Sequence, residues 1–198
     1  MKTKFVDTCM TIIQNNNDNL SKKNIDKMRY GLEGLYLNVT KIIFILIISL
    51  MLNIFKETLL LLLIFNLIRF TAFGVHAKRS IDCLISSTIF FIGFPLICIH
   101  IVISDIIKII IFIPILLLII KYAPADTVKR PLNNKKKRII YKILSIIISI
   151  IYIICSILIT DNTLSNCFLF ALVIQVIVIL PITYKLFGVP YNNHNNWD

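Results

Sequence analysis

The residues best suited to covalent chemistry in this chain are His76 and Cys83, which lie seven positions apart in a short polar stretch between two long apolar runs. A cysteine attacks a carbonyl as its thiolate, and a neighbouring imidazole can accept the thiol proton. Lys78 and Arg79 add positive potential, whereas Asp82 opposes it unless it is paired with one of them. The pattern predicts a nucleophilic cysteine and a histidine base at a membrane–water boundary.

The spacing of the pair also predicts a bend. On one continuous helix, residues seven apart share a face but are separated by about 10 Å along the axis, which is too far for a hydrogen bond. We therefore expect the preceding span to end near Phe73, Gly74 to permit a turn, and His76 to fold back toward Cys83. On a continuous helix, the base would have to come from elsewhere, including a second copy of the chain.

The remaining cysteines are weaker candidates. Cys98, Cys155 and Cys167 lie within or at the ends of apolar runs, where a thiol is usually an inert small hydrophobe. The chain has no C-x-x-C pair and no histidine spacing typical of zinc, so no metal, cofactor or disulfide framework is expected. From residue types alone, a catalytic pair and an incidental loop stay equally open.

The composition predicts an all-α polytopic membrane protein without a sizeable soluble domain. Of the 198 residues, 58% are hydrophobic, and several runs of about 17–25 mostly apolar residues could each cross a hydrocarbon core about 30 Å thick. About six transmembrane helices are expected within one domain, residues 41–184. The expected spans are about 41–55, 58–73, 82–103, 106–120, 139–159 and 164–183.

Residues 1–40 are expected to form a cytoplasmic leader of amphipathic helices that lie in the membrane interface. Residues 3–14 place apolar side chains at helical spacing, and Ser21 can cap a second helix whose apolar stripe recurs every three to four residues. A plain anchor is as acceptable a role as substrate docking. No removable signal peptide is expected, because the first strongly apolar run begins near Lys41.

Positive charge predicts the orientation in the membrane. With both termini cytoplasmic, including the tail 185–198, all of the 21 Lys and Arg residues except Lys56 and Lys108 fall on the cytoplasmic side. The net charge of +11 is then a topology signal, and no nucleic-acid partner is needed. Lys108 and Asp105 bracket the start of the fourth span, where we expect the lysine to extend to the interface.

Two stretches carry a family resemblance. The run GVHAKRSIDC at Gly74–Cys83 resembles the signature of the accessory gene regulator protein B family, membrane endopeptidases that process quorum-sensing propeptides. The run KYAPADTVKRPL at Lys121–Leu132 resembles the family's other recognisable segment, and the resemblance reaches Arg69 and Arg29–Glu33. It covers the whole chain in length, hydropathy and order of motifs. The chain is identified as a member of that family on these residues.

The resemblance carries the family's catalytic histidine and cysteine to His76 and Cys83. Many relatives have a second glycine ahead of the histidine, whereas here Gly74 is flanked by Phe73 and Val75, which makes the turn less free. The positions expected to support the pair are Arg69, Gly74, Lys78, Asp126 and Glu33.

The resemblance also implies a reaction. A short propeptide with an amphipathic leader and an acidic tail lies on the inner leaflet of a bacterial cell membrane, and its C-terminal tail is cut away. Cys83 attacks the scissile carbonyl to form a thioester, while His76 takes the thiol proton and then donates it to the leaving amine. A Cys or Ser of the peptide then closes a thiolactone or lactone ring.

Two parts of this machinery stay open in the sequence. The acid that orients the imidazole could be Asp82, Asp126 or Glu33, all predicted to be cytoplasmic. The oxyanion donor could be Arg69, Lys78 or a backbone amide at the start of the third span.

The basic cytoplasmic loop 121–138 has two interpretations. Its charge fixes the topology and contacts anionic lipid, and it could also attract an acidic substrate tail. The residues concerned are Lys129, Arg130, Lys135, Lys136, Lys137 and Arg138. The expected partners are the propeptide, membrane lipid and a second copy of the chain in a homodimer.

A non-catalytic transporter or peptide-export component is the alternative class. Six spans with a basic cytoplasmic side fit it, but no inverted repeat is visible and charged residues within the spans are few.

Overall fold

The computed structural model describes residues 2–15, 21–75, 79–127, 132 and 134–191. Regular structure in these ranges is helical, apart from one isolated parallel bridge between Phe73 and Ala125. The chain divides into two compact units, Met1–Ile47 and Ile48–Asp198, which are described separately. The predicted all-α class is confirmed for the described residues.

The first unit contains α1 (Lys2–Asn15) and most of α2 (Lys22–Met51). The two helices are joined by an ion pair between Asp7 and Arg29 and by a ring contact between Phe5 and Tyr36, whose centroids are 5.4 Å apart. The expected second leader helix is not a separate element, because α2 continues without a break into the first apolar span. No proline interrupts it, and each residue added to a running helix gains a hydrogen bond.

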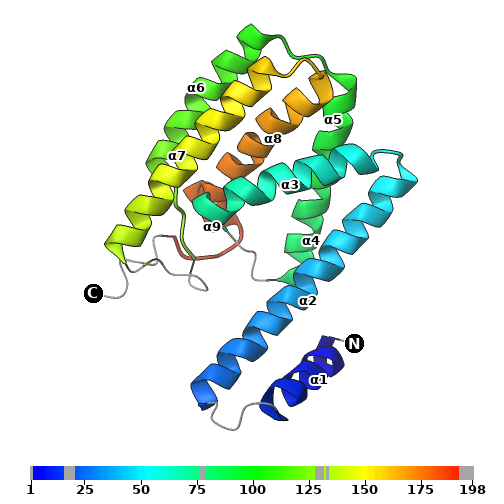
Figure 1. Cartoon of the computed structure of the whole chain (residues 1–198), viewed down its shortest axis with the longest axis vertical. Coiled ribbons are helices and arrows are strands. Elements are labelled where there is room, and N and C mark those ends of the chain that lie inside the picture. The colour runs from blue at the N-terminus through cyan, green and yellow to red at the C-terminus, as the bar shows by residue number, and fades with distance from the viewer. Residues whose placement is uncertain (1, 16–20, 76–78, 128–131, 133, 192–198) are drawn as a thin grey trace. The chain divides into compact units, whose positions relative to one another are not determined.

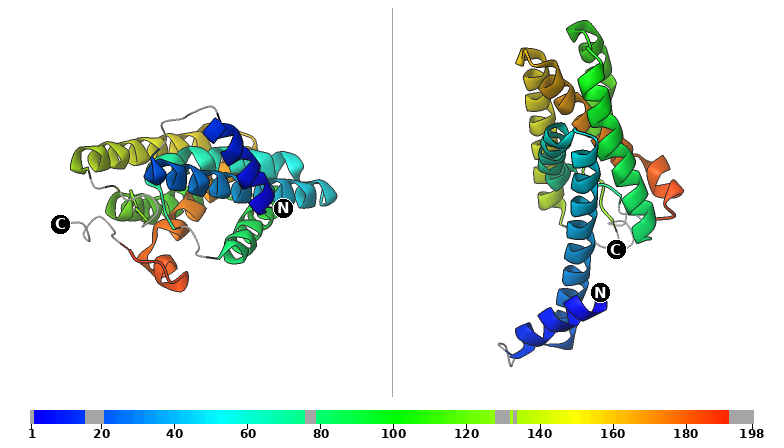
Figure 2. Two further views of the ribbon diagram at one scale, coloured as in Figure 1. Left: turned by 90° about the horizontal axis from the view of Figure 1, so that it is seen from below. Right: turned by 90° about the vertical axis from the view of Figure 1, so that its right-hand side faces the viewer.

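The second unit holds the remaining helices around α8 (Asn162–Ile179), which is apolar on all sides and the most buried of them (Figure 1). It packs against five helices, α3, α5, α6, α7 and α9, and α7 and α8 lie side by side (Figure 1 and Figure 2). A helix without a polar face is expected at the centre of a bundle. The other elements are α3 (Phe55–Ala72), α4 (Ser80–Thr88), the π-helical η1 (Ile89–Gly93), α5 (Phe94–His100), α6 (Asp105–Tyr122), α7 (Lys135–Leu158) and α9 (Pro181–Leu186).

Each of the six expected spans corresponds to a helix, but four stretches of the described chain are long and apolar enough to cross a membrane. The helices α3 and α6 are 18 residues long, as α8 is, but each contains three charged residues. The number of six and the orientation therefore remain predictions. The four stretches are Asn24–Met51, Ser80–His100, Lys135–Leu158 and Asn162–Ile179.

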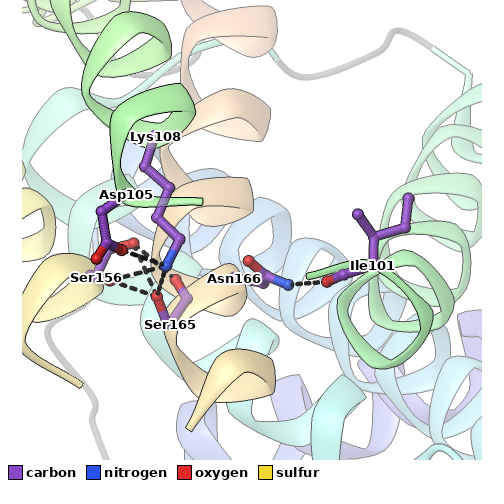
Figure 3. A network of polar contacts seen from close by, with 6 residues as sticks. All are labelled: Ile101, Asp105, Lys108, Ser156, Ser165 and Asn166. Atoms are coloured by element: carbon purple, nitrogen blue, oxygen red, sulfur yellow. Dashed lines mark hydrogen bonds and ion pairs between the residues drawn. The ribbon is translucent and has the colours of Figure 1, made fainter. Parts of the chain in front are cut away.

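The expectation that Lys108 extends to interfacial water is wrong. The residue is 3% exposed, and Nζ donates to Ser165 Oγ at 2.8 Å, to Asp105 Oδ1 at 3.3 Å and to the Ser156 carbonyl at 3.4 Å (Figure 3). These three acceptors replace the hydrogen bonds to water that the ammonium group loses on burial. These four residues, the lysine cluster, join α6, α7 and the first turn of α8.

Candidate functional site

The chain between the predicted base and nucleophile is not one helix. The helix α3 ends at Ala72, and α4 begins at Ser80. The predicted break is therefore confirmed. His76 and Lys78 lie outside the described residues, so the described part of the site consists of the turn that leads to His76 and the helix that carries Cys83.

The turn after α3 depends on Gly74. Phe73 has a φ of 56° and Gly74 a φ of 123°, so two successive residues adopt left-handed backbone conformations. A Cβ atom at Gly74 would lie 2.2 Å from Arg69 Nη1 and 2.8 Å from the Val178 carbonyl oxygen. The predicted glycine turn is confirmed, and both its backbone conformation and the space around it require glycine.

Phe73 stands in a conformation that a bulky residue rarely adopts, at a cost on the order of 1–3 kcal/mol. Such a conformation persists only where the surroundings hold it. The side chain is 6% exposed, and its ring meets that of Tyr141 edge to face at 5.0 Å. The lack of a second glycine beside Gly74 is thus compensated by packing.

Arg69 holds the turn through its guanidinium group. Nη1 donates to the Phe73 carbonyl at 2.7 Å, and Nη2 donates to the carbonyls of Gly74 at 3.1 Å and Val75 at 2.6 Å. Carbonyls at and beyond a helix C-terminus lack helical donors, and a cation is favoured there. Both terminal nitrogens are engaged in this way, so Arg69 holds the backbone of the turn.

The helix α8 holds the same turn from a second side. Gln175 Nε2 donates to the Phe73 carbonyl at 2.8 Å, and the backbone N–H of Val75 donates to the Val178 carbonyl at 2.8 Å. Sequence reasoning missed both residues. The available signal was a lone amide, Gln175, in the apolar run Ala171–Ile179.

The two sequence motifs of the family lie in contact. The Gly74 N–H donates to the Ala125 carbonyl at 2.9 Å, and the Ala125 N–H donates to the Ala72 carbonyl at 3.0 Å. The Tyr184 hydroxyl donates to the carbonyls of Ala125 at 2.8 Å and Asp126 at 3.1 Å. The segment after α6 is therefore fixed between α3 and α9, beside the turn that precedes His76.

Asp126 is buried in this region, with 1% of its surface exposed. Burial raises the pKa of Tyr184. The charge of Arg69 lowers this pKa, and the charge of Asp126 raises it. Both charged groups thus lie close enough to influence the same phenol. Because the tyrosine titrates above its ordinary range, its hydroxyl remains protonated and continues to donate to the Asp126 carbonyl at neutral pH.

Cys83 stands in the first turn of α4 and is half-buried. Its N–H donates to the Arg79 carbonyl at 3.3 Å, which begins the helix. The unpaired N–H groups of a first turn carry partial positive charge and favour a nearby anion. The turn thus suits a thiolate at this position.

The other predicted residues are dispersed. Lys129 and Arg130 lie outside the described residues, and Glu33 belongs to the first unit. The residues 135–138 form the first turn of α7, where the three lysines are exposed and Arg138 is half-buried. Asn134 caps this helix, accepting from the N–H groups of Lys136 at 2.9 Å and Lys137 at 3.3 Å.

An all-helical fold with four stretches long and apolar enough to cross a membrane defines a helical membrane-type protein among the described residues. Residues 6–179 match the family model described as Accessory gene regulator B, and the chain belongs to that family.

Named relatives come from several bacteria. The Accessory gene regulator protein B of Staphylococcus aureus strain MW2 is 35% identical over 183 residues, covering 91% of this chain and 95% of the relative. That of Staphylococcus epidermidis is 32% identical over 180 residues, with 87% and 91% covered. A putative AgrB-like protein of Clostridium acetobutylicum is 30% identical over 172 residues, with 87% and 82% covered. No solved structure matches the chain significantly.

Proposed function

We propose that this protein is a membrane-embedded cysteine endopeptidase that cuts the C-terminal tail from a quorum-sensing propeptide and promotes its macrocyclisation. The observation that carries the proposal is the helix break at Phe73–Gly74, which Arg69 and α8 hold in one conformation. A straight helix would keep His76 and Cys83 apart, whereas a fixed turn gives the chain a route back. The resemblance of Gly74–Cys83 to the family's signature supports the same pair of residues.

Helix electrostatics support an imidazolium–thiolate pair. The C-terminus of α3 precedes His76, and the N-terminus of α4 carries Cys83. A helix C-terminus favours a cation and an N-terminus favours an anion, each by about 0.3–1 kcal/mol at an exposed site. Proton transfer from the Cys83 thiol to the His76 imidazole creates charges of those two signs.

The proposed reaction proceeds by acyl transfer. Cys83 Sγ attacks the scissile carbonyl, His76 takes the thiol proton, and the same proton passes to the amine as the C–N bond breaks. The leader peptide is then a thioester on Cys83. A thiol or hydroxyl of the peptide attacks this thioester, closes the ring and returns the cysteine, and high effective concentration favours ring closure over hydrolysis.

Asp126 is the acid that we assign to orient the imidazole. Its carboxylate is buried, and it directly follows Ala125, which pairs with the turn before His76. Asp82 stands beside Cys83 in α4, where a negative charge opposes a thiolate. Asp126 is therefore better placed than Asp82 to stabilise a positive imidazole.

The site is proposed to face the cytoplasm, with both termini on that side of a bacterial cell membrane. The propeptide would lie on the inner leaflet, where the exposed lysines at the start of α7 can attract its acidic tail. Membrane lipid and a second copy of the chain are the other proposed partners.

The test is coexpression with a candidate propeptide encoded beside the gene. Cys83→Ala and His76→Ala should abolish the truncated product, whereas Cys155→Ala, which removes a half-buried thiol from α7, should retain it. Trapping of a hydroxylamine-sensitive adduct on the wild type, absent from Cys83→Ala, identifies the thioester. Cutting that persists in Cys83→Ala contradicts the proposal and favours a carrier that works with a separate protease.

A further inference from the structure

Gln175 is a fully buried amide in an apolar helix. Its side chain is 0% exposed, and the three residues on each side of it in α8 are apolar. A primary amide is costly to bury unless its polar atoms are paired. Within the described chain, its Oε1 has no hydrogen-bond partner, so Nε2 makes the one bond that the side chain forms there.

That one bond is made to the Phe73 carbonyl, which also accepts a hydrogen bond from Arg69. Phe73, with its left-handed backbone, accepts from Arg69 Nη1 at 2.7 Å and from Gln175 Nε2 at 2.8 Å. The two donors come from different helices, α3 and α8. The carbonyl is therefore fixed in direction, because rotation of the Phe73–Gly74 peptide breaks both bonds.

One helical turn beyond Gln175, α8 makes a second contact with the same loop segment, two residues after Phe73. The Val178 carbonyl, next to the last residue of the helix, accepts the N–H of Val75, the residue directly before His76. Gln175 and Val178 are three apart and so lie on one face of the helix. One face of α8 thus holds both ends of the three-residue segment 73–75.

We propose that Gln175 is a positioning residue for the cleavage reaction, acting through the Phe73 carbonyl to hold the turn that delivers His76. This inference rests on the proposed peptidase function. It assigns to α8, which carries neither of the two reacting side chains, a share in forming the active site. A displacement of about 1 Å in a catalytic group can cost about 100-fold in rate, so a single hydrogen bond at the base of the turn matters.

The chain offers a matched control at the opposite end of the same helix. Asn166 is also a fully buried amide of α8, and its Nδ2 donates to the Ile101 carbonyl at 2.7 Å and to the Cys98 carbonyl at 3.3 Å (Figure 3). Gln175→Met and Asn166→Leu each remove one buried amide that donates to backbone carbonyls. They differ in whether an accepting carbonyl belongs to the turn before His76.

The experiment uses the full-length protein in lipid nanodiscs with a synthetic propeptide. Gln175→Met should lower kcat by about 10- to 100-fold with little change in KM, while Asn166→Leu should leave kcat within about threefold. Thermal unfolding of both variants should show comparable losses. Equal kcat values for the two variants, or a loss confined to KM, would overturn the positioning role.

A second variant keeps the test decisive if Gln175→Met does not fold. In Gln175→Glu, a protonated carboxyl can donate to the Phe73 carbonyl, whereas the ionised form cannot and competes for Arg69. The ratio of its kcat to that of the wild type should therefore rise as the pH falls. A ratio that does not change with pH refutes the proposal.

The two hypotheses fail in different ways. Cutting by Cys83→Ala removes the peptidase and with it this inference. Cys83-dependent cutting that Gln175 variants do not impair removes the inference alone.

Discussion

Two cations, the buried Lys108 and the half-buried Arg69, lie against opposite ends of α8 and have different roles. The lysine cluster joins the ends of three regular helices, and Nζ bonds side chains and a carbonyl without disturbing the backbone (Figure 3). Arg69 bonds three successive carbonyls of a segment that contains two left-handed residues. Backbone strain is retained where the surroundings hold it, and it concentrates at functional sites. The comparison indicates a clamp on regular helices at one end and a braced, strained turn at the other.

Substitution of Gly74 should give the largest effect. In Gly74→Ala the new Cβ overlaps Arg69 Nη1 and the Val178 carbonyl, so the turn must shift. Propeptide cleavage should fall by about 100-fold or more. Cleavage measured on membranes with equal amounts of folded protein checks this, with Gly93→Ala as the control because nothing lies within 4 Å of a Cβ there. Normal cleavage by Gly74→Ala would show that the turn tolerates movement.

The substitution Arg69→Lys tests whether the turn needs only the positive charge of Arg69 or also the geometry of its guanidinium group. An ammonium keeps the positive charge but cannot bond three carbonyls with the planar fork of a guanidinium. Cleavage should fall by about 10- to 100-fold, with a smaller change in KM than in kcat. Steady-state kinetics with a synthetic propeptide give the two parameters. Full activity would mean that the charge alone suffices, and the distinction between the two cations would weaken.

Lys108→Met should lower stability and leave cleavage nearly unchanged. The substitution removes the hydrogen bonds from Nζ to Ser165 Oγ and to the Ser156 carbonyl, which should lower the free energy of unfolding by about 1–3 kcal/mol. Cleavage by the folded fraction should stay within about twofold of the wild type. Denaturant unfolding in detergent and single-turnover cleavage measure the two quantities. A large loss of kcat would place the lysine cluster in the catalytic machinery.

Neutralisation of the first turn of α7 should give the smallest effect. Changing residues 135–138 to Gln should slow cleavage of an acidic-tailed propeptide a few-fold at low salt, and the deficit should vanish as ionic strength screens the attraction. A variant in which each Lys becomes Arg and Arg138 becomes Lys keeps the charge and serves as the control. A deficit that does not depend on salt would remove the substrate-attraction role.

The part of the site that sequence predicted is local in origin. The break after α3, the turn at Gly74 and the position of Cys83 at a helix start follow from hydropathy and from the backbone freedom of one glycine. Such properties depend on a few neighbouring residues, so they are legible without the fold. The helix α2 runs past residue 40 for a related reason, because a change in polarity does not by itself stop a helix that lacks a breaking residue.

The sequence alone determined that this chain is helical, rich in segments able to cross a membrane, and equipped with the two motifs of its family. The tertiary structure decided which residues meet. Gln175 bonds a residue 102 positions away, Tyr184 bonds one 59 positions away, and Lys108 is paired rather than exposed. These outcomes depend on which helix ends converge, since a carbonyl freed at one helix end takes whatever donor the packing brings to it.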